Sequence, residues 1–162
     1  ETTRHLIGNS LEALCSDPAL LEELQHRPEL IPVFVEESLR HDPPIHVLLR
    51  DCVSPVAIEG TEIPLGSKVA FGLASANRDE SVFPEPDAFR LDRPNGREHL
   101  AFGGGPHVCP GSSLARLEGR VAIEVFVQRC SSAVLAPGYR REPVPVFWAQ
   151  GPARLSAIVD RA

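Results

Sequence analysis

Ten residues, Phe102-Gly-Gly-Gly-Pro-His-Val-Cys-Pro-Gly111, form the most informative pattern in this chain, because glycines surround a single cysteine. Gly103, Gly104 and Gly105 allow left-handed backbone angles and place no side chain in the way of a large, flat ligand. The pattern therefore predicts a loop whose backbone can approach a bound group closely.

The residues after this loop have the spacing of a helix. Leu114, Leu117, Val121 and Val125 recur at intervals of three or four, and further apolar residues lie between them. Such a run indicates a helix with little polar surface. We therefore predict a mostly buried helix over residues 112–129.

Cys109 lies just before the start of this predicted helix. The free N–H groups and the positive end of a helix dipole favour a thiolate there, and the thiolate is the form that binds metal. A lone soft ligand suits haem iron better than zinc, because zinc needs three or four protein ligands and Cys15, Cys52 and Cys130 show no zinc-site spacing. The alternative is that Cys109 is a small buried apolar residue, which remains our interpretation for the other three cysteines.

Three motifs together resemble one known family. The pattern F-G-x-G-x-H-x-C-x-G, formed here by Phe102, Gly103, Gly105, His107, Cys109 and Gly111, is similar to the haem-binding signature of the cytochrome P450 family. Glu37-Ser-Leu-Arg40 matches the E-x-x-R motif of the family's K helix. Asn77-Arg-Asp, followed by Phe83-Pro-Glu-Pro-Asp-Ala-Phe89, resembles the segment that leads into the meander of bacterial members. The order and separations of the motifs agree with the family along nearly the whole chain.

The resemblance implies that residues 1–162 form a single partial domain, the C-terminal haem-binding portion of the fold. Glu1-Thr2-Thr3 looks like the end of the acid-alcohol motif in the middle of the family's I helix, so we expect the N-terminal part to be absent. The implied fold class is α+β and mainly α. Its expected parts are the end of the I helix, the J and K helices, a small β-sheet, the meander, the cysteine loop, the L helix and C-terminal strands.

Local patterns predict the elements independently of the resemblance. Asp17-Pro18 has the form of a helix cap followed by a first-turn proline, and Ile31, Phe34, Val35 and Leu39 form an apolar stripe. We predict helices over 2–14, 18–26 and 29–41, strands over 47–49, 56–58, 62–64 and 68–73, structured coil over 82–100, and weak strands within 144–159.

Composition limits the class of protein. The chain has 162 residues, of which 43% are hydrophobic and 23% charged, which is typical of one globular domain. A net charge of −6 argues against nucleic-acid binding. No apolar run approaches the roughly 20 residues that cross a bilayer, and four cysteines without a pairing pattern fit a reducing compartment. We expect a soluble, cytoplasmic protein that does not insert into membranes.

The spacing of Glu37 and Arg40 by itself predicts an exposed ion pair, since both lie away from the apolar stripe. The resemblance implies instead a buried network, completed by a meander residue, that holds the cysteine loop in place. We assign Arg93 as the third member. His99 is the competing candidate, and Ala88 occupies the position where many relatives carry arginine.

The resemblance also assigns residues around the cofactor. His107 and Arg50 are expected to donate hydrogen bonds to the haem propionates, with a solvated surface position as the alternative for each. Arg116 and Arg120, four residues apart on the last helix, are expected to dock an acidic ferredoxin. Their alternative is a solvated helix face partly paired with Glu124.

The distal side of the haem is assigned in the same way. Glu1 and Thr2 match the acid and alcohol that relay protons to bound dioxygen in the family. Ile45, Val47 and Leu48 match the strand that faces the substrate, and their apolar character suggests a greasy ligand. A buried strand would show the same pattern.

The function implied is that of a haem-thiolate monooxygenase, which inserts one oxygen atom into a small, mostly apolar substrate. Its cofactor would be haem b, with electrons from NAD(P)H through a reductase and a ferredoxin. Two alternatives stay open. In the first, the chain is a non-catalytic relative that acts as a partner or activator protein. In the second, it is a split portion that needs its complement or associates with itself.

Pro110, directly after the expected ligand, removes a backbone N–H that would otherwise hydrogen-bond to the sulfur. We expect the thiolate to keep more charge and the haem to have a lower reduction potential than in a Pro110→Leu variant.

Overall fold

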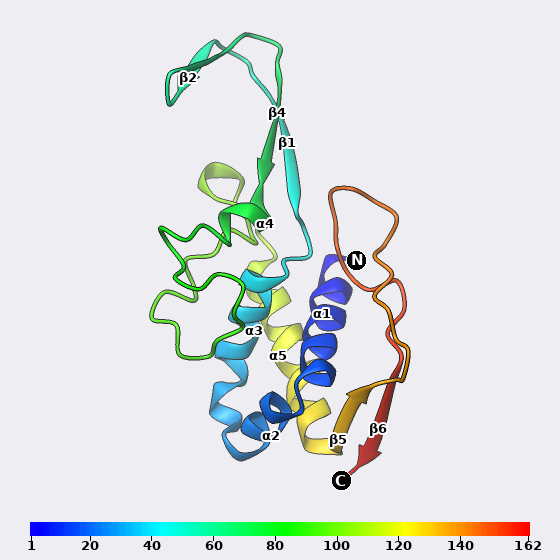
Figure 1. Ribbon diagram of the computed structural model, residues 1–162. Helices are drawn as coiled ribbons and strands as arrows, with labels where there is room; N and C mark the ends of the chain where they lie inside the picture. The colour runs from blue at the N-terminus through cyan, green and yellow to red at the C-terminus, as the bar shows by residue number, and fades with distance from the viewer.

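Four helices form the body of the molecule in the computed structural model, which describes residues 1–162 (Figure 1). They are α1 (Thr2–Ser16), α2 (Pro18–His26), α3 (Ile31–His41) and α5 (Ser112–Arg129). A 3₁₀ turn over Pro28–Leu30 leads into α3, and a second, over Gly105–His107, lies within the cysteine loop. The three N-terminal helices agree with the predicted ones to within two residues at each boundary.

The predicted start signals explain where these helices begin. The Asp17 side chain accepts a hydrogen bond from the backbone N–H of Ala19 at 3.1 Å, and Pro18 occupies the first turn of α2. An N-cap carboxylate of this kind stabilises a helix by about 1 kcal/mol. In α3 the second residue is Pro32, a position where the missing N–H has no intrahelical partner in any case.

The hydrophobic core lies where α1, α2, α3 and α5 meet. Leu6, Leu14, Leu24, Phe34 and Ile123 are each at most 1% exposed. The apolar stripe predicted for α3 is part of this core, because Ile31, Val35 and Leu39 are also buried. The core thus anchors the helices that carry the Glu37 and Arg40 motif and the residues after the cysteine.

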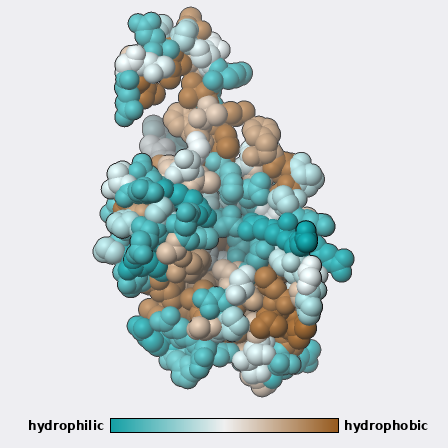
Figure 2. All heavy atoms as spheres, in the orientation of Figure 1, coloured by the Kyte–Doolittle hydropathy of each residue, from teal (hydrophilic) through white to brown (hydrophobic).

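An arm of two small antiparallel sheets extends from one end of the body (Figure 1). Strand β1 (Val47–Asp51) pairs with β4 (Lys68–Gly72), and β2 (Val56–Ile58) pairs with β3 (Thr61–Ile63). Apolar residues of the arm, coloured brown in Figure 2, are exposed. The short helix α4 (Leu73–Ala76) returns the chain to the body, and the predicted coil follows.

A third strand pair closes the chain and was only partly predicted. Strand β5 (Cys130–Leu135) follows α5 without a loop and pairs antiparallel with β6 (Ala157–Arg161). Strand β5 carries no clear sequence signal, because Ser131 and Ser132 interrupt the apolar alternation. The predicted weak strands around Trp148 are reduced to isolated bridges, one of which joins Ile45 to Ala149.

The prediction of a mostly buried helix over 112–129 is wrong about burial. The helix is present, but Leu114, Leu117, Val121 and Val125 are 58%, 48%, 45% and 42% exposed. Its core side is formed by the small residue Gly119 together with Ile123 and Val127. The helix carries apolar residues on all of its sides, so periodicity alone did not show which side faces the core.

None of the helices combines the length and the apolar character that crossing a lipid bilayer requires.

Candidate functional site

A cavity of about 390 Å³ lies where the start of α1, strand β1, the cysteine loop and the start of α5 meet. Of its 18 lining residues, 10 are hydrophobic, which gives it a largely apolar wall with a few polar groups, as small-molecule sites have. Of the cofactor-binding residues predicted from the sequence, Gly105 does not line it, whereas the other six do: Arg50, Phe102, Gly103, His107, Cys109 and Gly111.

The backbone of the cysteine loop explains its glycines. Gly103 and Gly105 have φ angles of 70° and 64°, in the left-handed region where other residues are strained. The N–H of Cys109 donates to the carbonyl of Phe102 at 2.9 Å, so the loop closes on itself around these glycines. Cys109 is half-buried and borders the cavity.

The donor set around this cavity fits a haem group. A single thiol borders it together with a guanidinium, from Arg50, and an imidazole, from His107. A Cβ added to Gly111, which lines the cavity, would lie 3.9 Å from the sulfur of Cys109, so this glycine keeps the space beside the thiol clear. One sulfur, with two side chains nearby that can donate hydrogen bonds to carboxylates, suits a metal whose other ligands belong to a flat macrocycle.

The predicted distal residues divide into those that line the cavity and those that do not. Thr2, Ile45 and Leu48 line it, whereas Glu1 and Val47 do not. Successive side chains of a strand point to opposite faces, so Leu48 and Arg50 share one face of β1 and Val47 lies on the other. The prediction that Val47 faces this space therefore disagrees with the structure.

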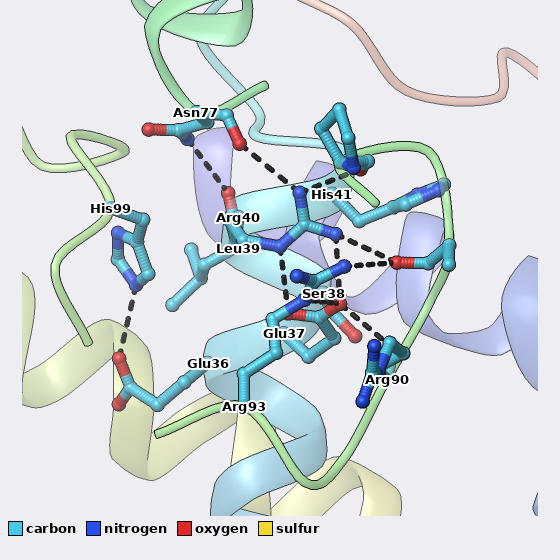
Figure 3. Close-up of polar contacts among 12 residues, drawn as sticks. Glu36, Glu37, Ser38, Leu39, Arg40, His41, Asn77, Arg90, Arg93 and His99 are labelled. Carbon is cyan, nitrogen blue, oxygen red and sulfur yellow. Dashed lines mark hydrogen bonds and ion pairs between the residues drawn. The ribbon is translucent and has the colours of Figure 1, made fainter. Parts of the chain in front are cut away.

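Glu37 and Arg40 lie at the centre of a buried polar cluster (Figure 3). Arg40 donates to both carboxylate oxygens of Glu37, each at 2.8 Å, and the two side chains are 0% and 1% exposed. The other guanidinium hydrogens of Arg40 reach the carbonyls of Asn77, Pro86 and Ala88 at 2.8–3.1 Å. The exposed ion pair that the spacing alone predicts is therefore wrong, because Glu37 and Arg40 form a buried pair.

Arg93 completes this cluster in the structure. Its Nε lies 3.0 Å from Oε1 of Glu37, and its side chain is 4% exposed. Its remaining donors reach carbonyls of Pro84, Glu85 and Ala88. Ala88 thus contributes its backbone oxygen, and His99, the competing candidate, lies elsewhere.

His99 belongs to a second network, around Glu36, that sequence reasoning missed. Nε2 of His99 lies 3.0 Å from Oε2 of Glu36, and Arg116 donates to the same carboxylate from Nε at 2.7 Å and from Nη2 at 3.1 Å. Burial alone would raise the pKa of Glu36, but the hydrogen bonds from His99 and Arg116 outweigh it and lower the pKa to about 2. The only sequence signal was a second glutamate beside Glu37.

The two arginines predicted to dock a partner differ in their surroundings. Arg116 is bound to Glu36, its guanidinium carbon lies 4.6 Å from the centre of the Phe102 ring, and its side chain is 36% exposed. Arg120 is 46% exposed and pairs with Glu124 at 3.4 Å, as on a solvated helix face. Only Arg120 thus matches the solvated alternative.

Comparison with known proteins agrees with this geometry. The sequence family described as Cytochrome P450 matches residues 16–144. The Biotin biosynthesis cytochrome P450 of Bacillus subtilis is 45% identical over 137 residues, covering 84% of this chain and 34% of that protein. Cytochrome P450 144 of Mycobacterium tuberculosis is 37% identical over 131 residues, covering 81% of this chain and 30% of that protein.

Solved structures share the fold. Cytochrome P450 CYP150A6 of Mycobacterium marinum, in the substrate-free form, superposes with a TM-score of 0.96 and 36% identity, over 100% of this chain and 42% of that one. P450BioI, in complex with an acyl carrier protein that carries hexadec-9Z-enoic acid, superposes with a TM-score of 0.92 and 40% identity. The match covers 99% of this chain and 41% of that one. The chain thus spans about a third of the length of the curated relatives that it matches.

Proposed function

Since this chain belongs to the cytochrome P450 family, we propose that it is the haem-binding part of a haem-thiolate monooxygenase. The reaction is insertion of one oxygen atom from dioxygen into a small, mostly apolar organic substrate. The observation that carries this proposal is the meeting of Cys109, His107 and Arg50 around one largely apolar cavity. Arg50 lies more than 50 positions before His107 and Cys109 in the sequence, so only the fold brings the three residues together.

Haem b is the proposed cofactor, and Cys109 is its proposed iron ligand. Arg50 and His107 are placed at the cavity to donate charge-assisted hydrogen bonds to the propionates, which would orient the ring. When bound, the haem supplies the binding and reductive activation of dioxygen. Gly103 and Gly111 line the cavity without side chains that would meet the ring, and the Glu37 cluster fixes the coil over 84–93, which precedes the loop.

Proton delivery and substrate binding are assigned to the opposite wall of the cavity. The Thr2 hydroxyl, which borders the cavity, would pass protons into it, and Glu1, the preceding residue, would resupply them. Ile45 and Leu48 supply apolar surface for a greasy substrate. The apolar wall is the observation that supports this substrate class.

Electrons are proposed to come from NAD(P)H through a reductase and a ferredoxin that docks at Arg116 and Arg120. Both side chains lie on α5, which begins three residues after Cys109, and both are partly exposed. An acidic donor would be attracted to guanidinium groups there despite the net charge of −6.

The absorbance spectrum of the reduced, carbon monoxide-bound chain tests the proposal. After addition of haem, we expect the main band to lie far to the red, as a thiolate opposite carbon monoxide causes, and Cys109→Ser to abolish that shift. Cys52→Ser is the matched control, because Cys52 lies on the arm outside the cavity. A chain that takes up no haem, or a red-shifted band that survives Cys109→Ser, would contradict the assignment.

A second candidate function is that of a portion that works with a covering partner. The exposed apolar side of α5, formed by Leu114, Leu117, Val121 and Val125, supports it, because such a patch favours association. The covering surface is proposed to be either the upstream part of the family fold or a second copy of this chain. Size-exclusion chromatography, with the chain alone and mixed with the upstream region of a relative, separates these cases.

A further inference from the structure

The carboxylate of Glu36 connects helix α3 to two other segments of the chain. Both of its oxygens are used: Oε1 accepts from Nε of Arg116 at 2.7 Å, and Oε2 accepts from Nη2 of Arg116 at 3.1 Å and from His99 at 3.0 Å. Glu36 is 5% exposed and His99 7%. The group is therefore a buried acceptor with hydrogen bonds at both oxygens, unlike the exposed ion pairs elsewhere on this helical body.

Both ring nitrogens of His99 are also occupied. Nδ1 accepts from the backbone N–H of Ala101 at 3.3 Å, which leaves the hydrogen on Nε2 for Glu36. A neutral imidazole satisfies both bonds at once. His99 is thereby held in one orientation, with its ring centre 6.0 Å from that of Phe102.

Phe102 is where this network meets the cysteine loop. The guanidinium of Arg116 lies over the Phe102 ring at 4.6 Å, an arrangement that favours a planar cation held flat by its carboxylate partner. The backbone carbonyl of Phe102 accepts from the N–H of Cys109 at 2.9 Å. A continuous set of contacts thus runs from Glu36 through Arg116 and Phe102 to Cys109.

Within the loop the restraints are backbone hydrogen bonds, such as those from Gly103 to Leu100 at 2.8 Å and from Val108 to Gly105 at 3.1 Å. Three consecutive glycines separate Phe102 from Pro106, and glycine leaves the backbone freer than any other residue. The Glu37 cluster contacts the carbonyls of Pro84 and Ala88 rather than the loop, whereas Glu36 points away from that cluster and towards His99 (Figure 3). Phe102 is the large side chain through which the body can restrain the loop from its N-terminal end.

We propose that Glu36, His99 and Arg116 are positioning residues that hold Phe102 and, through it, the position of the Cys109 sulfur. The consequence for an iron ligand rests on the proposed function, whereas the restraint on the loop does not. The network therefore acts on the haem-free chain as well.

Thiol labelling of the haem-free chain tests the restraint directly. In a Cys52→Ala background, the rate at which a maleimide modifies each remaining cysteine is followed by mass spectrometry of the digested protein. We expect Glu36→Gln and Arg116→Gln each to raise the rate at Cys109 by roughly fivefold or more, the scale of one lost restraint. The buried thiols of Cys15 and Cys130 serve as internal controls and should stay unmodified.

Arg120→Gln is the matched control, because Arg120 lies one turn along α5 and pairs only with Glu124. It should leave the labelling of Cys109 unchanged. An unchanged rate in Glu36→Gln and Arg116→Gln would overturn the proposal. A rise of equal size at Cys15 and Cys130 would also overturn it, because the network would then support the fold as a whole.

Phe102→Leu tests whether the contacts act through the ring. If they do, Arg116→Gln adds no further increase in a Phe102→Leu chain, since coupled residues give non-additive effects. Additive increases would exclude Phe102 as the link. With haem bound, the same variants should lower the fraction of red-shifted carbon monoxide complex. Absence of haem uptake would contradict the proposed function alone and would leave the labelling result unaffected.

Discussion

Arg40 and Glu37 face each other through two parallel hydrogen bonds of 2.8 Å, with both side chains at most 1% exposed. A bidentate pair of this kind combines charge with fixed geometry. Because Arg93 and three backbone carbonyls satisfy the remaining donors and acceptors, the charges are buried without an unpaired group. The pair therefore joins α3 to the coil over 77–93, which precedes the cysteine loop in the chain.

Removing one partner of this pair should destabilise the chain strongly. We expect Arg40→Ala to lower the free energy of unfolding by about 3–5 kcal/mol, because it leaves Glu37 buried and partly unpaired. Urea unfolding, monitored by circular dichroism, measures this change in the free energy of unfolding. Arg27→Ala is the control, since Arg27 pairs with Glu23 at 57% exposure and should cost at most about 1 kcal/mol. Equal losses in the two variants would contradict the buried network.

The depressed pKa of Glu36 predicts a loss of stability in acid. Its folded pKa of about 2 lies below the unfolded value of 4.5, so its contribution is complete above about pH 4.5 and is lost as the pH falls towards 2. The difference corresponds to about 3 kcal/mol. We expect Glu36→Gln to be less stable at pH 7 and to lose less stability between pH 4.5 and 2. Parallel pH profiles of unfolding for the two proteins would contradict this.

Gly151 should not tolerate a side chain. A Cβ there would lie 2.8–2.9 Å from three atoms of the His5 side chain, which is 2% exposed. We expect Gly151→Ala to lower the free energy of unfolding by about 1–3 kcal/mol through overpacking. Gly104→Ala is the control, because its φ of −157° suits any residue and its Cβ would meet no atom within 4 Å. A neutral result for Gly151→Ala would show that His5 can move aside.

Pro110→Leu should raise the reduction potential of the haem-bound chain. The substitution restores a backbone N–H directly after Cys109, and hydrogen bonds to a sulfur ligand draw charge from it. Redox titration of the two proteins, each reconstituted with haem, provides the measurement. Identical potentials would show that this N–H does not reach the sulfur.

The exposed side of α5 should drive association of the isolated chain. We expect Leu117→Glu and Val121→Glu to keep the helical content and to lower the mass measured by sedimentation, because both positions are nearly half exposed. Ile123→Glu, at a position that is 0% exposed, should instead unfold the chain. If wild type and Leu117→Glu sediment identically as monomers, the exposed side of α5 does not drive association.

Short-range chemistry explains which features could be predicted. The cap at Asp17, the stripe of α3 and the glycine pattern before Cys109 are each encoded within about ten residues. Strand β5 was missed because its two buried residues, Cys130 and Ala133, are separated by two exposed serines, which gives no clear alternation.

By itself, the amino-acid sequence determined where α1, α2 and α3 lie, which loop carries the cysteine, and the family resemblance that comparison then confirmed, because caps, periodicity and glycine conformations act locally. Only the tertiary structure decided which side of α5 is buried, that Arg93 joins Glu37, and that Glu36 joins His99 and Arg116. Those outcomes depend on pairs 56 to 80 residues apart. Such pairs join segments that only the packing of the core brings together, and periodicity within one segment does not encode a contact with another.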